Sequence, residues 1–359
     1  MSDIKFSRQA DSTFYATLKK RVDNYFIEKN ISRFGNSSMV LKTIFTLAMY
    51  LGPLAFIILV PVNNVWLYLA IWLLIGLGKS AVGMCVMHDA NHGSYSSKKW
   101  VNFLLSQTMN LLGGNSNVWK IQHNVLHHTF TNVDGVDDDL EGPGFMRFSP
   151  HQPKKPIHKY QHLFAYFPYS LMTYQRLFKS DFAQVFRYSK EGLLSSDTTL
   201  TWQFIQVALW KLIYVGVFLV LPIMTAPFHW SIVLLGFSLM HLVAGEILSL
   251  IFQSAHVMPD NLFPLPNEEG LLEEHWAIHQ MQTTTNFARK SPLFSWFVGG
   301  LNYQVEHHLF MNICHVHYKN LSPIVQETAK EFGVPYNFEP TFRAAVKSHI
   351  KMLKDLGNS

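Results

Sequence analysis

Residues 43–78 read TIFTLAMYLGPLAFIILVPVNNVWLYLAIWLLIGLG and contain no Asp, Glu, Lys or Arg. A second stretch with the same property covers residues 212–245. Each is too long for one buried helix and about right for two membrane spans, because a bilayer core of ~30 Å needs roughly 20 apolar residues. Turn residues interrupt the first stretch at 61–64, and the second at Pro222 and then at 226–227. The sequence therefore predicts an all-α integral membrane protein with four spans. The expected spans are about 39–60, 65–87, 203–226 and 230–253.

The composition of the 359 residues agrees with this fold class. Hydrophobic residues make up 48% and charged residues only 15%, whereas ordinary globular chains carry about 25% charged residues. These values exclude a disordered protein and a coiled coil. The net charge of +5 comes with no basic patch, so no nucleic-acid partner is expected. Two cysteines, Cys85 and Cys314, are too few for a disulfide framework or a cysteine zinc site.

The basic residues indicate the topology. Most of the 29 lie in the N-terminal segment, in the connection 88–202 and from residue 254 onward, and the two short hairpin loops carry none. The positive-inside rule then places the N-terminus, the long connection and the C-terminus in the cytoplasm. The mostly polar first forty residues do not fit a cleavable signal peptide. We expect a cytoplasmic segment 1–38, a four-span domain 39–318 with a cytoplasmic helical cap, and a cytoplasmic helical segment 319–359.

Three connecting regions have helical patterns of their own. Residues 100–112 are apolar but too short to span, which predicts a re-entrant or interfacial helix. Residues 157–180 interleave aromatic and basic side chains, as a helix at the headgroup level would, although such helices could equally cap a cytoplasmic domain. Residues 319–359 predict an amphipathic helix, a turn at FGVPYNFEP and a final helix.

Three clusters account for many of the eighteen histidines. They are HDANH with His88 and His92, HNVLHH with His123, His127 and His128, and QVEHH with Gln304, His307 and His308; His256 follows the fourth span alone. On a helix, a spacing of i, i+4 puts both rings of a pair on one face. Neutral imidazole binds zinc, copper, iron and nickel. Eight histidines exceed the needs of one ion that keeps open positions for reaction, so two metal ions in one site are expected.

The other histidines favour ordinary roles. His229, His241 and His349 stand alone, and a structural or solvated role is expected for each. His151, His158 and His162 are expected to face the headgroups. His275 and His279 share helical spacing without further support, so a ligand role and an outer supporting role both stay open.

The order and spacing of HDANH, HNVLHH and LNYQVEHHLF, with the four-span layout, resemble the membrane fatty-acid desaturases over roughly residues 35–340. Gln304, in place of a histidine, resembles the front-end subgroup, which desaturates between an existing double bond and the carboxyl end. The chain also resembles bacterial linoleoyl-CoA-type, delta-6-like desaturases. Met311 departs from the family, which usually has proline there, and this concerns the geometry of that turn.

The resemblance implies a di-iron centre, with dioxygen as co-substrate. Its ligands would be His88, His92, His123, His127, His128, His256, His307 and His308. Gln304 could bind iron weakly, act through water or shape the acyl pocket. The chain has no HPGG haem motif, so the electrons would come from a separate donor of the ferredoxin or cytochrome-b5 type. The implied substrate is a fatty-acyl thioester or an acyl lipid, and a bacterial plasma membrane is favoured.

Polar residues beside the motifs could orient the ligating imidazoles. They are Asp89, Asn91, Asn132 and the acidic run Asp137-Asp138-Asp139. The alternative is that Asp134-Gly135 is a turn and the acidic run begins a helix.

Other functions remain open at this level. The same superfamily includes lipid and alkane hydroxylases and ketolases, although QVEHH argues against them. A metal transporter would place its ligands near mid-membrane, and a non-catalytic scaffold would lack several of these histidines.

Two charged residues, Lys79 and Glu246, lie inside the predicted spans, where an isolated charge is unfavourable. Lys79 and Glu246 lie about 13 Å and 15 Å below His88 and His256 at 1.5 Å per residue. The similar depth predicts an ion pair between them. The alternative is that Lys79 extends towards the headgroups and Glu246 is neutral against a hydroxyl.

Overall fold

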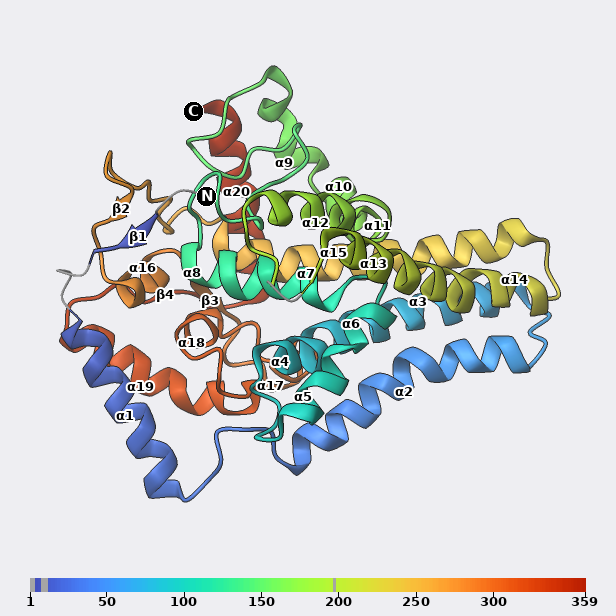
Figure 1. The fold of residues 1–359 in the computed structure, drawn as a ribbon, viewed down its shortest axis with the longest axis horizontal. Coiled ribbons are helices and arrows are strands. Elements are labelled where there is room, and N and C mark those ends of the chain that lie inside the picture. Colours follow the sequence, from blue (N-terminus) through green and yellow to red (C-terminus); the bar gives the residue numbers. More distant parts are fainter. Residues whose placement is uncertain (1–3, 8–11, 196–197) are drawn as a thin grey trace. The chain divides into compact units, whose positions relative to one another are not determined.

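The computed structural model describes residues 4–7, 12–195 and 198–359 (Figure 1). The chain forms two compact units, each assembled from segments that lie far apart in the sequence. Unit 1 comprises residues 1–36, 122–165 and 250–359, and unit 2 comprises residues 37–121 and 166–249. Both are mostly helical, which confirms the predicted fold class. The linear division after residues 38 and 318 stays a prediction.

Unit 2 contains the predicted spans. Among the described residues, four helical stretches are long and apolar enough to cross a membrane, and they agree with the predicted spans to within a few residues: Ser37–Leu59, Val65–His92, Leu200–Thr225 and Trp230–His256. The elements that begin in this unit are α2 (Ser37–Leu59), α3 (Val65–Val82), the π-helix η1 (Gly83–Met87), α4 (His88–His92), α5 (Lys99–Ser106), α6 (Thr108–Leu111), α7 (Ser116–Lys120), α10 (Tyr166–Ser170), α11 (Met172–Gln175), the π-helix η4 (Arg176–Ser180), α12 (Asp181–Lys190), α13 (Leu200–Val215), the π-helix η5 (Gly216–Val220), α14 (Leu221–Thr225) and α15 (Trp230–His256).

Local sequence explains where the spans begin and end. Asn64 caps α3 by accepting a hydrogen bond from the backbone N–H of Leu67 at 3.0 Å, which satisfies one of the unpaired donors at a helix N-terminus. Pro222 does not end its helix, contrary to the predicted break there. It follows the π-helical turn η5 and the helix continues to Thr225, because local π geometry can accommodate the missing proline N–H. The break comes at Ala226, whose backbone is extended.

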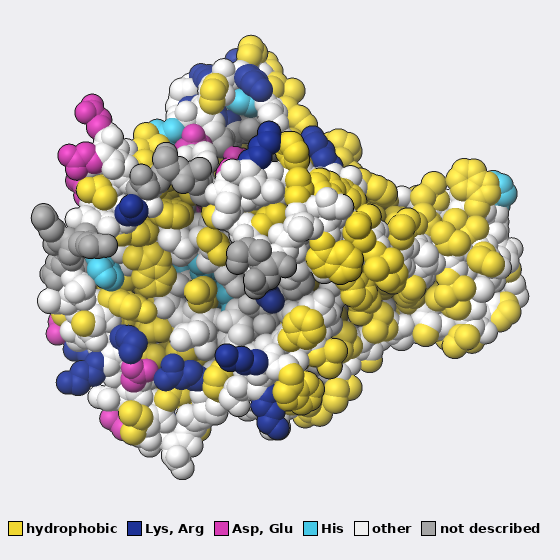
Figure 2. Space-filling model, in the orientation of Figure 1, with side chains coloured by type: hydrophobic (Ala, Val, Ile, Leu, Met, Phe, Trp, Pro, Cys, Tyr) yellow, Lys and Arg dark blue, Asp and Glu magenta, His cyan; other side chains and the backbone are white. Residues whose placement is uncertain are grey.

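The long helices of unit 2 expose apolar side chains in large numbers. Figure 2 shows hydrophobic side chains gathered over the region of α2, α13 and α14. Leu41, Leu59, Leu212 and Met224 are each at least two-thirds exposed. An apolar surface of this extent is suited to lipid rather than water, which agrees with the predicted membrane spans.

The interior of unit 2 is aromatic. Tyr50 stacks on Phe218 with ring centroids 5.0 Å apart, and Phe218 stacks on Tyr214 at 4.7 Å. Helix α15 approaches α10 closely at Gly245, where an added Cβ would lie 2.2 Å from the carbonyl oxygen of Ser170. Only glycine allows this approach.

The predicted ion pair between Lys79 and Glu246 is wrong. The Lys79 ammonium is fully buried, donates to the Tyr214 hydroxyl at 2.8 Å and lies 3.3 Å from Nδ1 of His241. Glu246 makes no ion pair with a described residue, and its buried Oε2 has no hydrogen-bond partner among them. A similar depth of Lys79 and Glu246 along their helices is not sufficient for an ion pair, because the two side chains must also face each other. His241 and Glu246 are five residues apart on α15, which rotates them about 140° from each other around the helix.

The connecting helices are more broken than the sequence suggests. Residues 100–112 form the short helices α5 and α6. Residues 157–180 form a series of short helices instead of one, and Pro168, which has no N–H to donate, lies in the middle of the series. Trp100, Phe103, Leu163 and Phe167 are exposed. The interfacial location of these helices stays a prediction.

Unit 1 combines helices with two short parallel strand pairs, β1 with β2 and β3 with β4. Its elements are β1 (Lys5–Phe6), α1 (Thr13–Lys29), the π-helix η2 (Ile121–His127), α8 (His128–Phe130), the 3-10 helix η3 (Pro156–Tyr160), α9 (Gln161–Phe164), β2 (Leu271–Leu272), α16 (Trp276–Gln282), β3 (Thr285–Phe287), α17 (Pro292–Phe297), α18 (Gln304–Leu309), the 3-10 helix η6 (His315–His317), α19 (Tyr318–Glu331), β4 (Asn337–Glu339) and α20 (Phe342–Asn358), with the last turns of α15. The two predicted helices after residue 318 are present, and the turn between them also carries β4.

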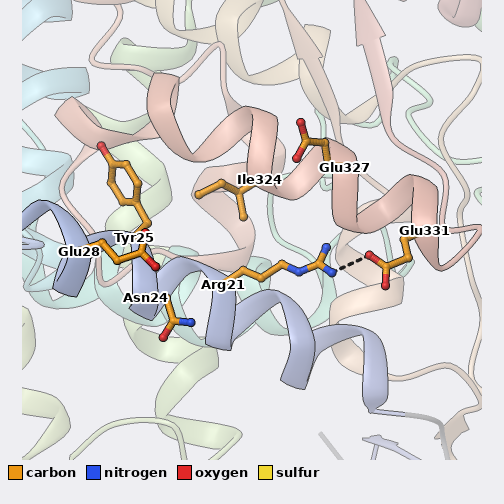
Figure 3. Close-up of a pocket in the computed structure, with 7 residues that line it drawn as sticks. All are labelled: Arg21, Asn24, Tyr25, Glu28, Ile324, Glu327 and Glu331. Carbon is orange, nitrogen blue, oxygen red and sulfur yellow. Dashed lines mark hydrogen bonds and ion pairs between the residues drawn. The ribbon is translucent and has the colours of Figure 1, made fainter.

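Helix α1 packs on α19 through one apolar face. Its buried residues Phe14, Leu18, Val22 and Phe26 recur every four positions, as one side of a helix requires. At the edge of this contact Arg21 forms an ion pair of 2.6 Å with Glu331, beside a shallow polar pocket (Figure 3). Exposed pairs of this kind contribute little to stability.

The last helix is anchored by one buried guanidinium. Arg147 donates to the carbonyl oxygens of Leu356 at 2.6 Å, Pro150 at 2.6 Å and Gln152 at 2.8 Å. Further along α20, Nδ1 of His349 donates to the carbonyl of Val257 at 2.9 Å. Helix α20 therefore supports the chain just after His256.

Candidate metal centre

The second histidine motif adopts a π-helix, not the α-helix that the i, i+4 spacing predicts. In an α-helix, His128 would be rotated about 140° from His123 and would face away. The wider π turn, with i→i+5 hydrogen bonds, brings positions i, i+4 and i+5 to one side. Nε2 of His128 consequently lies 3.2 Å from Nε2 of His123, and the ring of His127 is centred 5.2 Å from that of His123.

The third motif reaches the same place from α18. Gly299 and Gly300, both with positive φ, turn the chain into this helix. The ring centroid of His128 lies 4.5 Å from that of His307 and 4.4 Å from that of His308. After the helix, Met311 occupies a turn closed by a hydrogen bond of 2.9 Å from Ile313 N–H to the Phe310 carbonyl.

His256 joins the same cluster from the end of α15. Its ring lies 4.7 Å from that of His127 and 4.8 Å from that of His308, between centroids. Unit 1 therefore gathers six of the eight predicted ligands, all at most 5% exposed: His123, His127, His128, His256, His307 and His308. We call these six side chains the histidine cluster.

Two groups of side chains within the cluster could each hold a metal ion. Donor atoms of His127, His256 and His308 lie within 4.8 Å of one another, and the same holds for His128, His307 and His308. His308 is common to both groups. A neutral imidazole offers one lone pair, so His308 could serve only one of these groups at a time.

The remaining ring nitrogens show whether the cluster fits a metal. Nδ1 of His127 lies 3.0 Å from the Asp137 carboxylate, and Nδ1 of His256 lies 3.3 Å from the Thr283 carbonyl. The buried Nε2 atoms of both histidines have no hydrogen-bond partner among the described residues. A ligating histidine donates from one nitrogen to an acceptor of the protein and presents the other to the metal. The residues fit such a site.

Asp137 is itself held in place. It accepts backbone hydrogen bonds from Asn132 at 2.9 Å and Asp139 at 3.0 Å. Burial opposes protonation of His127, but the charges of Asp137 and Asp139 outweigh it and raise the pKa of His127 to about 9. Burial also opposes the charge on Asp137, and the pairing with His127 overcomes this and lowers the pKa of that carboxyl. Metal binding at His127 must therefore displace a proton.

The polar neighbours named from the sequence are partly found around the cluster. Asn132, in the left-handed region at φ 60°, donates from Nδ2 to the His256 carbonyl at 3.0 Å. Residues 133–140 form turns, so the alternative that the acidic run begins a helix is wrong, whereas the turn at Asp134-Gly135 is present. Gln304 is fully buried, and its amide makes no hydrogen bond of ordinary length to a described residue.

His88 and His92 belong to unit 2. They lie on α4 after the π-helix η1, with ring centroids 4.6 Å apart, so the predicted common face is confirmed. Both rings contact Trp119 at 5.7 Å. Asn91, between them, accepts from the Ser116 hydroxyl at 2.8 Å and donates to the Met87 carbonyl at 2.9 Å, which holds the short helix.

Among the other histidines, His241 and His349 have the structural roles expected for them. His241 contacts Thr173, Tyr214 and Lys79. His275 caps α16 by accepting from the Ala277 N–H at 3.1 Å. The prediction for His158 is wrong. It is 2% exposed, and its Nδ1 accepts from the Lys155 N–H and caps η3.

Sequence reasoning missed the residues that hold the third motif. Nδ1 of His308 lies 2.8 Å from Oε1 of Gln280, and Nδ1 of His307 lies 3.3 Å from the Tyr318 hydroxyl. In the stretch EEHWAIHQ the candidates were the histidines, His275 and His279. The residue that contacts the histidine cluster is Gln280, which follows them.

Comparison with known proteins identifies the family of this chain. A sequence model of the fatty acid desaturases matches residues 64–340. This chain belongs to the fatty acid desaturase family. It is therefore an oxidoreductase of a family that uses iron, and the histidine cluster could hold that metal.

The desaturase is similar along nearly its whole length to three relatives. It is 36% identical to the sn-1 linoleoyl-lipid 6-desaturase of Arthrospira platensis, over 96% of this chain and 92% of the relative. It is 35% identical to the sn-1 linoleoyl-lipid 6-desaturase of Synechocystis sp., over 99% and 98%. It is also 35% identical to the acyl-lipid (8-3)-desaturase of Physcomitrium patens, over 99% of this chain and 74% of the relative.

Proposed function

We propose that this desaturase inserts a cis double bond into an already unsaturated, linoleoyl-type acyl chain, at the delta-6-like position between the existing bonds and the carboxyl end. The observation that carries the proposal is the histidine cluster with its Nδ1 atoms held by protein acceptors. The names of the relatives support the acyl chain and the position, and they favour an acyl lipid over a thioester as the substrate.

The proposed iron ligands are the six residues of the histidine cluster together with His88 and His92. The cluster supports six of them by geometry, and the HDANH motif supports the other two by its resemblance to the family. Gln304 is proposed as a weak ligand or as a residue of the acyl pocket, because a buried amide without an ordinary hydrogen bond is available for either role.

The balance of the reaction explains why a metal is needed. The acyl chain loses two hydrogens, and dioxygen takes up these with two electrons and two protons to give two waters. Bound iron would supply the oxidising power that no side-chain acid or base has. The electrons are proposed to come from a separate ferredoxin or cytochrome-b5-type donor.

The chain's own residues would orient and protect this chemistry. Asp137 and the Thr283 carbonyl hold the rings of His127 and His256 through Nδ1, which leaves Nε2 directed away from them. The near-complete burial of the histidine cluster excludes water from it. We further propose that both termini face the cytoplasm, on the basis of the positive-inside rule, and that the membrane is a bacterial plasma membrane.

Expression in a host fed linoleate tests the proposal. The expected result is a new double bond on the carboxyl side of the existing ones, located by mass spectrometry of derivatised esters. Conversion of stearoyl to oleoyl chains with no action on linoleoyl would contradict it. Host background is subtracted with the His307→Ala variant, which should give no new product while remaining in the membrane.

A further inference from the structure

One short segment of unit 1 contacts three of the segments that carry the histidine cluster. Helix α16 and the residue after it, Trp276–Thr283, supply these contacts. The Trp276 indole donates to the His128 carbonyl at 3.0 Å, Oε1 of Gln280 lies 2.8 Å from Nδ1 of His308, and the Thr283 carbonyl lies 3.3 Å from Nδ1 of His256. The segment thus joins the second motif, the third motif and the end of α15.

Gln280 is at the centre of this arrangement. Its side chain is fully buried. The Thr131 hydroxyl lies 2.9 Å from Oε1 of Gln280 and 2.7 Å from the His127 carbonyl, and it can donate to either oxygen. Its oxygen also lies 3.3 Å from Nδ1 of His308, farther than Oε1 of Gln280 at 2.8 Å. The amide oxygen of Gln280 therefore connects His308 to the helix that carries His127.

The chemistry of the contact defines the state of the His308 ring. An amide oxygen accepts hydrogen bonds and cannot donate them, so Nδ1 of a neutral His308 carries the hydrogen and Nε2 carries the lone pair. His308 is also the residue common to both candidate metal groups. A rotation of this one ring would consequently move its donor atom away from whichever of the two groups it serves.

The amide nitrogen of Gln280 bears on the role of this residue. Nε2 of Gln280 is buried and has no hydrogen-bond partner among the described residues. A residue retained for packing alone would be better replaced by an apolar side chain of similar size, because an unsatisfied buried amide is destabilising. The hydrogen bond between Oε1 of Gln280 and Nδ1 of His308 offsets the cost of burying the unsatisfied amide nitrogen.

We propose that Gln280 is a positioning residue that fixes the tautomer and ring orientation of His308 through a neutral acceptor. The inference rests on the proposed function, because it assigns Gln280 a role towards the metal that the histidine cluster would hold. The acceptor at His127 is then charged, Asp137, whereas the acceptor at His308, Gln280, is neutral, like the Thr283 carbonyl at His256. A buried carboxylate at both positions would add a second negative charge to the centre.

Two substitutions separate acceptance from packing. Gln280→Leu removes the acceptor, whereas Gln280→Glu keeps an oxygen that accepts from His308. Gln282→Leu is the matched control, since its half-buried side chain lies on the same helix and makes no hydrogen bond to a histidine in the described part of the chain. Each variant is prepared as the full chain in detergent and stripped of metal.

The readout is titration with cobalt(II), followed by visible absorption, together with the melting temperature of the metal-free protein. Gln280→Leu should weaken cobalt binding about 10–100-fold, the usual effect of removing a residue that orients a ligating histidine. Gln282→Leu should bind cobalt like the unsubstituted protein, and Gln280→Glu should bind it at least as tightly, because its carboxylate still accepts from Nδ1 of His308 and adds negative charge near the ion. The metal-free melting temperature of Gln280→Leu should change little, because the loss of the acceptor for Nδ1 of His308 is opposed by the removal of a buried amide nitrogen without a partner among the described residues.

Three other results overturn the inference. Unchanged cobalt binding in Gln280→Leu would show that Gln280 does not act on His308. Loss of binding in Gln280→Glu as well would show that the NH2 group, not the oxygen, is the required atom. A lower metal-free melting temperature with unchanged affinity would assign a packing role. Absence of cobalt binding in the unsubstituted chain is a different result, since it refutes the proposed metal centre and this inference with it. If Gln280→Leu does not accumulate, the affinity of Gln280→Glu decides.

Discussion

His127 in unit 1 and His241 in unit 2 are both fully buried on long helical segments, yet their surroundings differ in one respect. The ring of His241 has a partner at each nitrogen, Thr173 at Nδ1 and Tyr214 at Nε2. The ring of His127 has Asp137 at Nδ1 and no hydrogen-bond partner at Nε2 among the described residues. Burial and helical position are therefore the same in the two histidines, and the difference lies at Nε2. An Nε2 without a partner is not by itself the mark of a ligand, because the buried His158 and His279 also have one among the described residues.

The largest expected effect comes from replacing each of these two histidines by alanine. His127→Ala should abolish desaturation and lower the iron content per chain, because a donor of one candidate metal group is lost. His241→Ala should keep its iron but lower the free energy of unfolding by about 2–4 kcal/mol, because it leaves a cavity and removes a partner of Lys79. Iron analysis, product analysis and denaturant unfolding of the same preparations check both. Normal activity of His127→Ala would refute the distinction.

A smaller effect is expected when the acceptor of His127 is weakened. Asp137→Asn preserves the size of the side chain but removes the charge that holds the Nδ1 hydrogen. We expect iron affinity to fall about 10–100-fold, measured by competition with a chelator. Asp355→Asn, on the exposed side of α20, should leave the affinity unchanged. Equal affinities in the two variants would mean that Asp137 only shapes its turn.

The polar cluster of unit 2 allows a test by coupling. Lys79→Met and Tyr214→Phe should show an interaction energy of about 1–2 kcal/mol in a double-mutant cycle, because the two side chains are hydrogen-bonded. Lys79→Met and Glu246→Gln should be additive to within about 0.5 kcal/mol. Unfolding in mixed micelles provides the free energies. Strong coupling of Lys79 with Glu246 would restore the ion pair that the structure contradicts.

The smallest effect concerns a structural histidine and pH. Burial lowers the pKa of His349 from 6.5 to about 4, so the unfolded chain binds a proton there before the folded chain does. The stability contribution is fully present above the unfolded pKa and is lost as the pH falls from 6.5 towards 4. Between pH 7 and pH 6 the expected loss is about 0.7 kcal/mol. His349→Gln should lose this part of the pH dependence, and an unchanged slope would contradict the assignment.

The sequence predicted those features that depend on one segment at a time. The spans follow from the missing charges in residues 43–78 and 212–245, and the common face of His88 and His92 follows from helical periodicity. It did not predict features that depend on two segments. Gln280 is 28 residues from His308, and the pairing of Lys79 with Tyr214 joins residues 135 apart. Depth in the membrane was readable from the sequence, but rotation about the helix axis was not.

The π-helix of the second motif also bears on how such motifs are written as search patterns. HNVLHH places its histidines at i, i+4 and i+5, whereas QVEHH places Gln304, His307 and His308 at i, i+3 and i+4. The first pattern is folded as a π-helix and the second as an α-helix, and in each case the three positions face one side. The π-helical turn holds more residues than the α-helical turn, so the longer spacing in HNVLHH still brings its three histidines to one side. Patterns with two or with three residues between the first and second position therefore describe the same surface in two helix types, and a search that permits only one spacing would divide equivalent sites.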